Sequence, residues 1–234
     1  MPQLLHSGLK MARLLLLMVV MLPACAATPQ DLSGKMFTFP QETNTAHVRL
    51  NTPLQSFSAV TVCLRSVTDL VRAHSLFSLA TPSVANGFLI FKAATRDAFD
   101  INVQDKAVTF GNQNYELNEW HSICSTWDTE SGLVQLWVDG KASIKKFTSG
   151  SAIKSPIVIL GQEQDSYGGG FDMSQSFVGA IHDVHMWNYV LSPCEIQRYT
   201  ETSNFTPGNV LNWRALDFQI TGRVLIEDRS ITCN

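Results

Sequence analysis

Residues 59–110 read AVTVCLRSVTDLVRAHSLFSLATPSVANGFLIFKAATRDAFDINVQDKAVTF. In this stretch, short runs of β-branched and aromatic residues alternate with groups of turn residues. The runs recur about every ten residues, a spacing typical of a β-sandwich or barrel. The stretch therefore predicts consecutive strands at 59–67, 74–80, 87–93, 98–103 and 107–110.

The same pattern continues toward the C-terminal third of the chain. Asp139-Gly140 is typical of a tight hairpin turn. We find no linker, repeat or low-complexity tract that would divide the chain. We therefore expect an all-β fold, a single antiparallel β-sandwich. The further predicted strands lie at 121–127, 133–138, 155–161 and 176–190.

One short helix is expected after these strands. Ser192 suits the N-cap, Pro193 the first helical position, and Glu195 a capping box with the serine. The segment IQRYTE at 196–201 can continue the helix for a few turns.

The first 26 residues have the pattern of a secretory signal peptide. Basic residues precede the apolar run 14–22, and Ala24-Cys25-Ala26 matches a cleavage site. The run is far shorter than the ~20 residues that span a bilayer. We therefore predict that residues 1–26 are removed, that residues 27–234 form one domain, and that the protein is secreted.

Four cysteines remain after the signal segment: Cys63, Cys124, Cys194 and Cys233. An even number in an oxidising compartment favours disulfides over free thiols. Their spacing matches no zinc motif and leaves all three pairings open.

The charge pattern argues against nucleic acid as the main ligand. The formal net charge is −3 and the basic residues are scattered, whereas phosphate backbones require a concentrated positive face. No segment after the signal is apolar over a membrane-spanning length. Asn204-Phe205-Thr206 is a glycosylation sequon, so we predict a modified surface loop at Asn204.

The segment GQEQDSYGGGFDMSQS, residues 161–176, concentrates oxygen-bearing side chains. Three consecutive glycines at 168–170 let the backbone fold back, so that Asp172 and Gln175 can meet Glu163 and Asp165. Calcium takes about six to eight oxygen ligands from carboxylates, amides and carbonyls. Composition alone fits either a calcium site or a solvated acidic loop.

A sandwich glycoside hydrolase is the competing interpretation of this segment. Glu163 and Asp165 would share one face at a strand end, but the proton donor expected shortly afterwards is replaced by Tyr167 and Gly168. The chain also contains no G-x-S-x-G motif. We therefore do not expect an enzyme.

His182 and His185 suggest a metal pair. Residues three apart in a regular strand point to opposite faces of the sheet. We therefore expect that the two histidines cannot bind one ion.

Several long segments, taken in order, carry a family resemblance. They are KMFTFPQET, AVTVCLRS, ICSTW, VQLWVDGK, ILGQEQDSYGGGFDMSQSFVG, MWNYVLSPCEI and VLNWRAL. From about Gln30 to Val224, the chain resembles the pentraxin family of secreted calcium-dependent proteins. The resemblance implies a flattened jelly-roll sandwich similar to legume lectins, a ring usually of five protomers, and a Cys63–Cys124 disulfide. We suggest a Cys194–Cys233 bond, with an interchain bridge as the alternative.

The resemblance also implies two adjacent calcium ions per protomer. Glu163 and Asp165 resemble the carboxylates that bridge both ions, and Gln164 resembles the residue that supplies a backbone carbonyl. Asp172 and Gln175 resemble the ligands that complete the second ion, with Asp172 standing where other members carry glutamate.

The first ion is expected to be held less well. The family has an Asp-Asn pair where this chain has Ala85-Asn86, so one carboxylate is missing and water would fill the gap. Phe91 matches the aromatic residue that packs on choline methyl groups in phosphocholine-binding members. The place of the glutamate that meets the quaternary nitrogen falls near Ala107, which leaves calcium-dependent phosphate binding better supported than choline selectivity.

Together these patterns predict a secreted, calcium-dependent pattern-recognition protein of innate immunity. Its expected ligands are phosphocholine-type or phosphoethanolamine-type head groups and acidic polysaccharides on microbes and damaged cells. The resemblance adds a homopentamer and complement as a partner. The alternatives are a pentraxin scaffold that has lost ligand binding and acts through protein–protein contacts, and the less favoured glycoside hydrolase.

Overall fold

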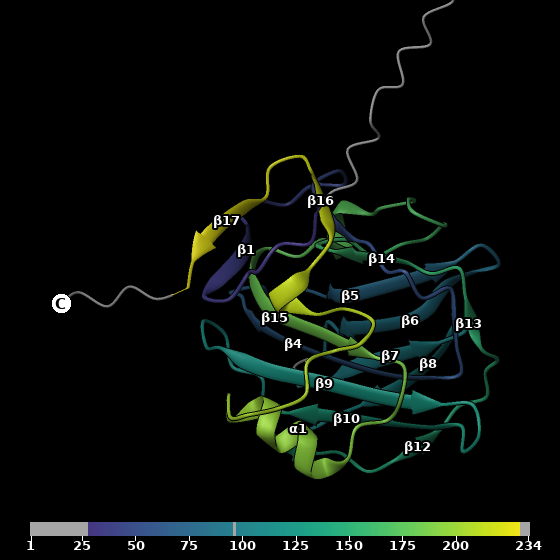
Figure 1. Ribbon diagram of the computed structural model, residues 1–234. Helices are drawn as coiled ribbons and strands as arrows, with labels where there is room; N and C mark the ends of the chain where they lie inside the picture. The colour runs from purple at the N-terminus through teal and green to yellow at the C-terminus, as the bar shows by residue number, and fades with distance from the viewer. Residues whose placement is uncertain (1–27, 96, 230–234) are drawn as a thin grey trace, which may run out of the picture.

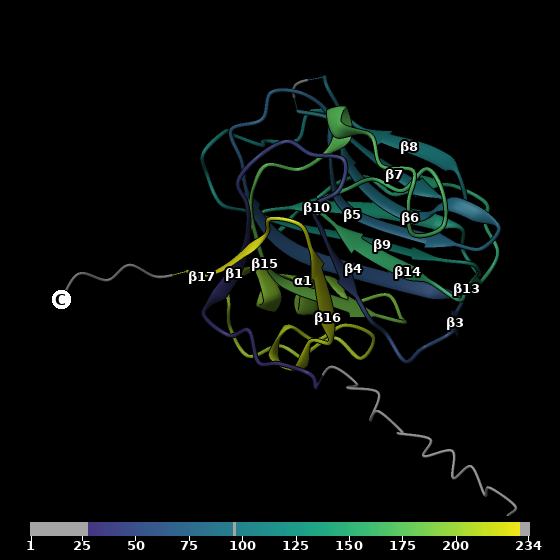
Figure 2. The same cartoon turned by 90° about the horizontal axis from the view of Figure 1, so that it is seen from above.

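The computed structural model describes residues 28–95 and 97–229. Two large antiparallel sheets lie against each other as two layers (Figures 1 and 2). The first sheet contains, in spatial order, β11 (Lys141–Ala142), β10 (Leu133–Val138), β9 (His121–Asp128), β4 (Ala59–Val67), β15 (Gly179–Trp187), β1 (Lys35–Phe39) and β17 (Leu225–Asp228), with β12 (Lys146–Phe147) also pairing with β10.

The second sheet contains Asn86 and Phe91, two of the residues singled out from the sequence. Its spatial order is β16 (Phe218–Thr221), β2 (His47–Leu50), β14 (Ile157–Leu160), β5 (His74–Thr81), β6 (Val84–Lys92), β7 (Phe99–Val103) and β8 (Lys106–Phe110). A small separate ladder joins β3 (Ser56–Phe57) to β13 (Ile153–Lys154). The predicted all-β sandwich is confirmed, as are the nine strands expected between residues 59 and 190.

Large apolar side chains fill the space between the sheets. Val62 and Leu64 of β4 and Phe88 and Ile90 of β6 are fully buried and belong to one core cluster. These pairs are two residues apart, so each strand turns one face inward. Burying such side chains contributes about 1.5–3 kcal/mol each.

The helix α1 (Pro193–Thr200) covers the outer face of the first sheet. Ser192 caps it, and both hydrogen bonds of the predicted capping box with Glu195 are present. Ile196 and Tyr199 are buried in a second apolar cluster, together with Trp187. No helix of the described segments is long and apolar enough to cross a membrane.

The same cluster contains the Cys63–Cys124 disulfide, which joins β4 to β9. The two cysteines are directly opposite each other in the strand register, with Cα atoms 4.1 Å apart. The pairing implied by the family resemblance is confirmed. Cys194 is exposed at the start of α1, while its suggested partner Cys233 and the expected signal segment 1–26 lie outside the described residues.

The two ends of the fold pair with each other. The last strand, β17, lies beside the first, β1, with Lys35 opposite Asp228 (yellow and purple in Figure 1). Lys35 Nζ also contacts the Asp228 carboxylate at 2.6 Å. The short strands β1, β2, β16 and β17 were not identified from the sequence.

A bulge in β15 corrects one expectation. Asp183 has a φ of 56°, and the strand register shifts between His182 and His185. His182 pairs with Arg65 and His185 with Cys63, two residues apart on β4, so both histidines lie on the outer face. The expectation of opposite faces was wrong because a bulge inserts one extra residue.

Candidate calcium site

The segment 161–176 is anchored by the side chain of Gln164. Its Nε2 donates to the backbone carbonyls of Ser78 (3.0 Å) and Ile157 (3.2 Å), and its Oε1 accepts from the N–H of Gly168 (3.0 Å). Gln164 is fully buried. The fold therefore uses this side chain, and a metal ion would have to use the backbone carbonyl, as the resemblance implied.

Two further side chains hold the ends of the segment. Gln162 Nε2 donates to two backbone carbonyls just before β2, at 2.8 and 2.9 Å. The guanidinium group of Arg72 donates to the carbonyls of Ser174 (3.1 Å) and Ser176 (2.7 Å). Asp172 caps the 3₁₀ turn η1 (Met173–Gln175) by accepting from the N–H of Ser174 at 2.9 Å. The segment is thus a fixed structure, held by two buried glutamine amides and by the Arg72 guanidinium group.

Asn86 lies near the start of β6, beside the turn that connects β7 and β8. The N–H of Asp105 in that turn donates to the carbonyl of Asn86 at 3.0 Å. The N–H of Asn86 donates back to Oδ1 of Asp105 at 2.8 Å. These two hydrogen bonds fix the predicted ligand Asn86 against a carboxylate that the sequence did not single out.

Three expected ligand oxygens are buried without a hydrogen-bond partner among the residues that the structure describes. They are Oδ1 of Asn86, Oε2 of Glu163 and Oε1 of Gln175. Glu163 as a whole is only 3% exposed. A buried acceptor without a partner costs about 1–3 kcal/mol, so such a group in a folded protein normally meets an ion or a water molecule. These oxygens are suited to a cation.

Negative charge accumulates around Glu163. Burial, with the nearby charges of Asp165, Asp105 and Asp172, raises the pKa of the Glu163 carboxyl group to about 7. A carboxylate with a raised pKa and acidic neighbours is destabilised when ionised. A divalent cation would relieve both the desolvation and the repulsion.

The donor set fits calcium better than a transition metal. All of the candidate atoms are oxygens, the donors that calcium prefers over nitrogen or sulfur. Within residues 28–95 and 97–229, no three His, Cys, Asp or Glu side chains are already gathered in a metal-binding cluster. Amide and backbone oxygens would therefore have to complete the ligand set, as calcium sites allow.

Comparison with known proteins places the chain in a family. Residues 35–228 match the Pentaxin family. The chain belongs to the pentraxin family. It is 42% identical over 205 residues to serum amyloid P-component of Mus musculus, covering 85% of this chain and 89% of that protein. It is 41% identical over 216 residues to C-reactive protein of Sus scrofa, covering 91% of this chain and 96% of that protein.

A solved structure supports the pentraxin fold. The native heptameric SAP-like pentraxin from Limulus polyphemus superposes with a TM-score of 0.75 at 24% sequence identity. The likeness covers 84% of this chain and 95% of that chain. At this identity the comparison shows the fold alone. The candidate ligand set rests on the residues of this chain.

In this pentraxin, the expected choline-contacting residue Phe91 lies on β6, five positions beyond Asn86. It is half-buried and stands directly opposite Asp100 of β7. Directly opposite residues share one face of the sheet, so an aromatic ring and a carboxylate are neighbours here. Ala107, where a glutamate was sought, is exposed on β8 and brings no charge.

Sequence reasoning overlooked the residues that position the site. Ser78 and Arg72 contact the segment 161–176 from β5 and from the loop before β5. Asp105 was also overlooked, because only the strand order brings its turn next to Asn86. All three are distant in sequence from the acidic segment.

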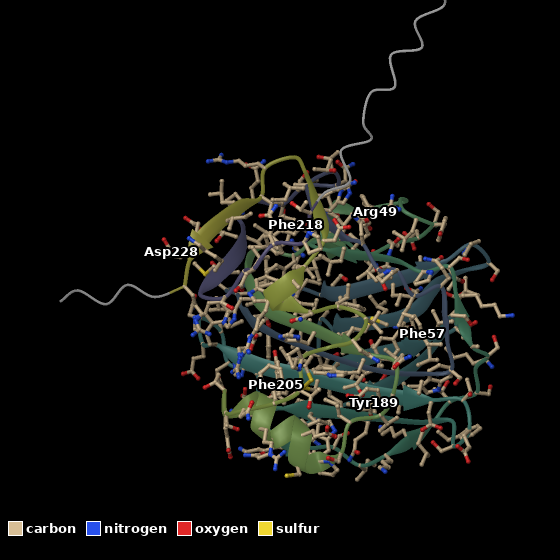
Figure 3. The ribbon with its side chains drawn as sticks, in the orientation of Figure 1. Arg49, Phe57, Tyr189, Phe205, Phe218 and Asp228 are labelled. Carbon is tan, nitrogen blue, oxygen red and sulfur yellow. A yellow bond between two sulfur atoms is a disulfide. The ribbon has the colours of Figure 1, made fainter. Side chains whose placement is uncertain are left out.

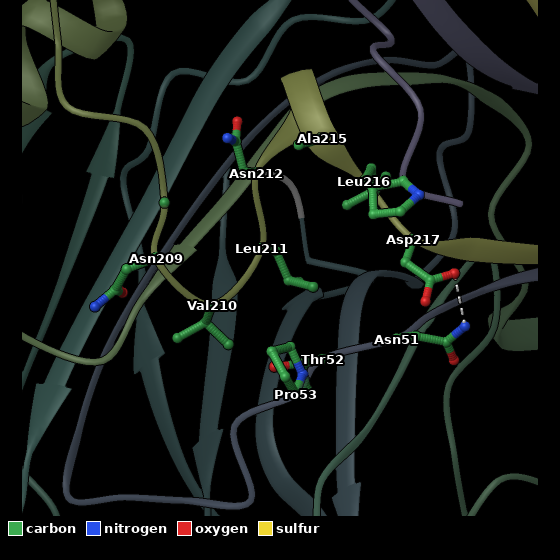
Figure 4. A pocket seen from close by; sticks show the side chains of 12 residues that line it. Asn51, Thr52, Pro53, Asn209, Val210, Leu211, Asn212, Ala215, Leu216 and Asp217 are labelled. Carbon is green, nitrogen blue, oxygen red and sulfur yellow. Dashed lines mark hydrogen bonds between the residues drawn. The ribbon is translucent and has the colours of Figure 1, made fainter. Parts of the chain in front are cut away.

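A cavity of about 500 Å³ lies in another part of this pentraxin. Its lining includes Asn51 and Asp217, whose side chains are hydrogen-bonded at 3.1 Å (Figure 4). Asn51 follows the end of β2, whereas Gln162 is anchored just before the start of β2. The cavity and the candidate calcium site are therefore at opposite ends of that strand.

The predicted glycosylation position is accessible. Asn204 is exposed in the loop that follows α1. Its neighbour Phe205, labelled in Figure 3, packs on Tyr199 of the helix, with ring centroids 5.2 Å apart. The helix thus holds the loop in place while Asn204 faces solvent, which is compatible with a glycan.

Proposed function

We propose that this pentraxin is a secreted, calcium-dependent recognition protein without catalytic activity. Its proposed ligands are phosphate monoesters, such as phosphocholine and phosphoethanolamine head groups, and acidic sugars on microbes and damaged cells. The observation that carries the proposal is a set of buried oxygens, on Asn86, Glu163 and Gln175, that have no hydrogen-bond partner within residues 28–95 and 97–229. Bound calcium would supply open coordination positions for anionic oxygens of the ligand.

Each candidate residue would have a separate role in binding the two ions. Glu163 and Asp165 would be shared between two ions, Asp172 and Gln175 would complete the second, and Asn86 would serve the first. Gln164 would contribute its backbone carbonyl while its side chain holds the segment in shape.

Phe91 and Asp100 suit the cationic end of a phosphocholine group. An aromatic face attracts a quaternary ammonium ion, and the Asp100 carboxylate opposite Phe91 would add a negative charge. This pair, rather than the uncharged Ala107, would decide any preference for choline.

Several copies would act together. Each single site is expected to bind a small head group weakly, and linked sites gain strength by multivalency. We propose a closed ring, five protomers being the family expectation; the Limulus relative with this fold is heptameric. Complement remains a partner expected from the family. Secretion is supported by the signal-like segment at 1–26 and by a formed disulfide.

The proposal is tested by chromatography on immobilised phosphocholine and phosphoethanolamine. We expect retention in calcium, elution by chelator, and no retention of Glu163→Gln in calcium. Glu201→Gln, which removes an equal charge from an exposed residue beyond α1, should behave as the wild type. Equal retention in chelator would refute the calcium mechanism.

A scaffold function is favoured by one observation, the loss of a carboxylate at Ala85. Calorimetry decides between the two, since a scaffold with an impaired site would take up neither calcium nor phosphocholine. Turnover of a polysaccharide would instead revive the hydrolase interpretation.

A further inference from the structure

The position of Asp105 bears on the carboxylate that is missing at Ala85. Asp105 belongs to the two-residue turn between β7 and β8, where Val103 pairs with Lys106. The turn lies against Asn86, with one hydrogen bond in each direction between the two residues. A carboxylate therefore stands beside the retained ligand Asn86, although it comes from another strand pair.

The backbone of the turn is left-handed, a conformation that aspartate tolerates better than most residues. Gln104 and Asp105 have φ values of 51° and 59°, in the left-handed region. Two-residue hairpin turns of this kind favour glycine at the second position, because a side chain there is strained. Aspartate at this position is compatible with a requirement for its carboxylate at this place.

The Asp105 carboxylate also belongs to the charge cluster around Glu163. Its negative charge acts on Glu163, alongside those of Asp165 and Asp172. Oδ1 of Asp105 accepts the Asn86 N–H, while the residue as a whole is exposed. An independent sign of a ligand is the Oε2 atom of Glu163, a group 3% exposed and without a hydrogen-bond partner in the described part of the chain.

We propose that Asp105 is a calcium ligand that replaces the carboxylate lost at Ala85. The first ion would then be held by Asn86, Asp105, Glu163, Asp165 and the carbonyl of Gln164, with its negative charge restored. This inference rests on the proposed function, because it assigns a ligand within the same site. It replaces the expectation that water alone fills the gap.

The test is calcium calorimetry on Asp105→Asn. Asparagine keeps an oxygen that accepts the Asn86 N–H and removes only the charge, so the turn is preserved. We expect one calcium-binding step to weaken on the order of tenfold or more, since ligand charge sets affinity, while the other step changes little. Adding Ala85→Asp to Asp105→Asn should restore the lost affinity. Glu201→Gln is the control for net charge.

A second measurement separates a ligand from a structural residue. In chelator, the melting temperature of Asp105→Asn should equal or exceed that of the wild type, because a repulsive charge near Glu163 is removed. Unchanged calcium affinity in Asp105→Asn, or a loss matched by an equal fall in the melting temperature in chelator, would overturn the inference alone. Absence of calcium binding by the wild type would overturn the proposed function, and this inference with it.

Discussion

Replacing Gln164 by leucine tests whether a buried amide keeps the segment 161–176 in shape. The Gln164 side chain donates to Ser78 and Ile157 and accepts from Gly168. Leucine has a similar size but can make none of these hydrogen bonds. Both the stability of the fold and the position of the Gln164 carbonyl should therefore suffer.

The magnitude follows from the groups left without a partner. The carbonyls of Ser78 and Ile157 lie in the sheet and lose a donor, at a cost of about 1–3 kcal/mol each. Gly168 is exposed, so its N–H can bond to water instead. We therefore expect the free energy of unfolding in chelator to fall by about 3 kcal/mol. Calcium affinity should fall roughly 10–100-fold, as for other residues that orient metal ligands.

Urea unfolding in chelator and calcium calorimetry measure the two effects. Gln219→Leu, at an exposed glutamine of β16, is the matched control and should change neither quantity. Gln164→Glu should also be destabilised, because a carboxylate keeps the acceptor for Gly168 but cannot donate to the two carbonyls. If Gln164→Leu matched the wild type in both assays, the anchoring role argued from these hydrogen bonds would be wrong.

Three further predictions concern the stability of the fold. Burial lowers the pKa of His74 from 6.5 to about 4, so this neutral histidine stabilises the fold above pH 6.5. That contribution, about 3 kcal/mol, is lost as the pH falls from 6.5 to 4. In His74→Gln, the free energy of unfolding measured with urea should therefore depend less on pH between 4 and 6.5. An unchanged pH profile would contradict this prediction. In Gly179→Ala, the new Cβ would lie 2.2 Å from the carbonyl oxygen of Val67, at a backbone φ of +136°. We therefore expect the free energy of unfolding to fall by about 3 kcal/mol or more, measured by thermal unfolding. A melting temperature equal to that of the wild type would refute the clash. Replacing Cys63 and Cys124 by alanine opens a loop spanning 61 positions, which should cost about 4 kcal/mol in chain entropy; a loss below about 1 kcal/mol would count against that account.

The central strands were predictable because their signal is local. β4 contains the residues expected for it, Ala59–Val67, since alternating apolar side chains and flanking turns mark it out. β1 and β17 pair with each other from the two ends of the chain, and all four residues of β17 are exposed. Their strand structure comes from a distant partner rather than from their own pattern, and β propensity is known to depend on such context.

The bulge at Asp183 shows a second limit. A regular alternation assigns His182 and His185 to opposite faces, and a left-handed aspartate reverses that result. Aspartate tolerates this conformation better than most residues, yet aspartates are common in ordinary strands and loops. A one-residue shift of register therefore decides which face of the sheet the two histidines lie on, and periodicity alone could not predict that shift.

The candidate site also has one part that was predictable from the sequence and one part that was not. Its acidic segment was predictable because the oxygens of Glu163, Asp165 and Asp172 are close in sequence. Compensation for Ala85 was not predictable, because it requires knowledge of which strands flank Asn86.

The strand order limits where that compensation can arise. β6 lies between β5 and β7, so the turns beside Asn86 are the β5–β6 and β7–β8 turns. The β5–β6 turn is Pro82-Ser83 and carries no acid, whereas the β7–β8 turn is Gln104-Asp105. A carboxylate lost from β6 can therefore be replaced from a neighbouring turn at Asp105. A chain with alanine at position 85 and an uncharged residue at position 105 should hold its first calcium ion weakly.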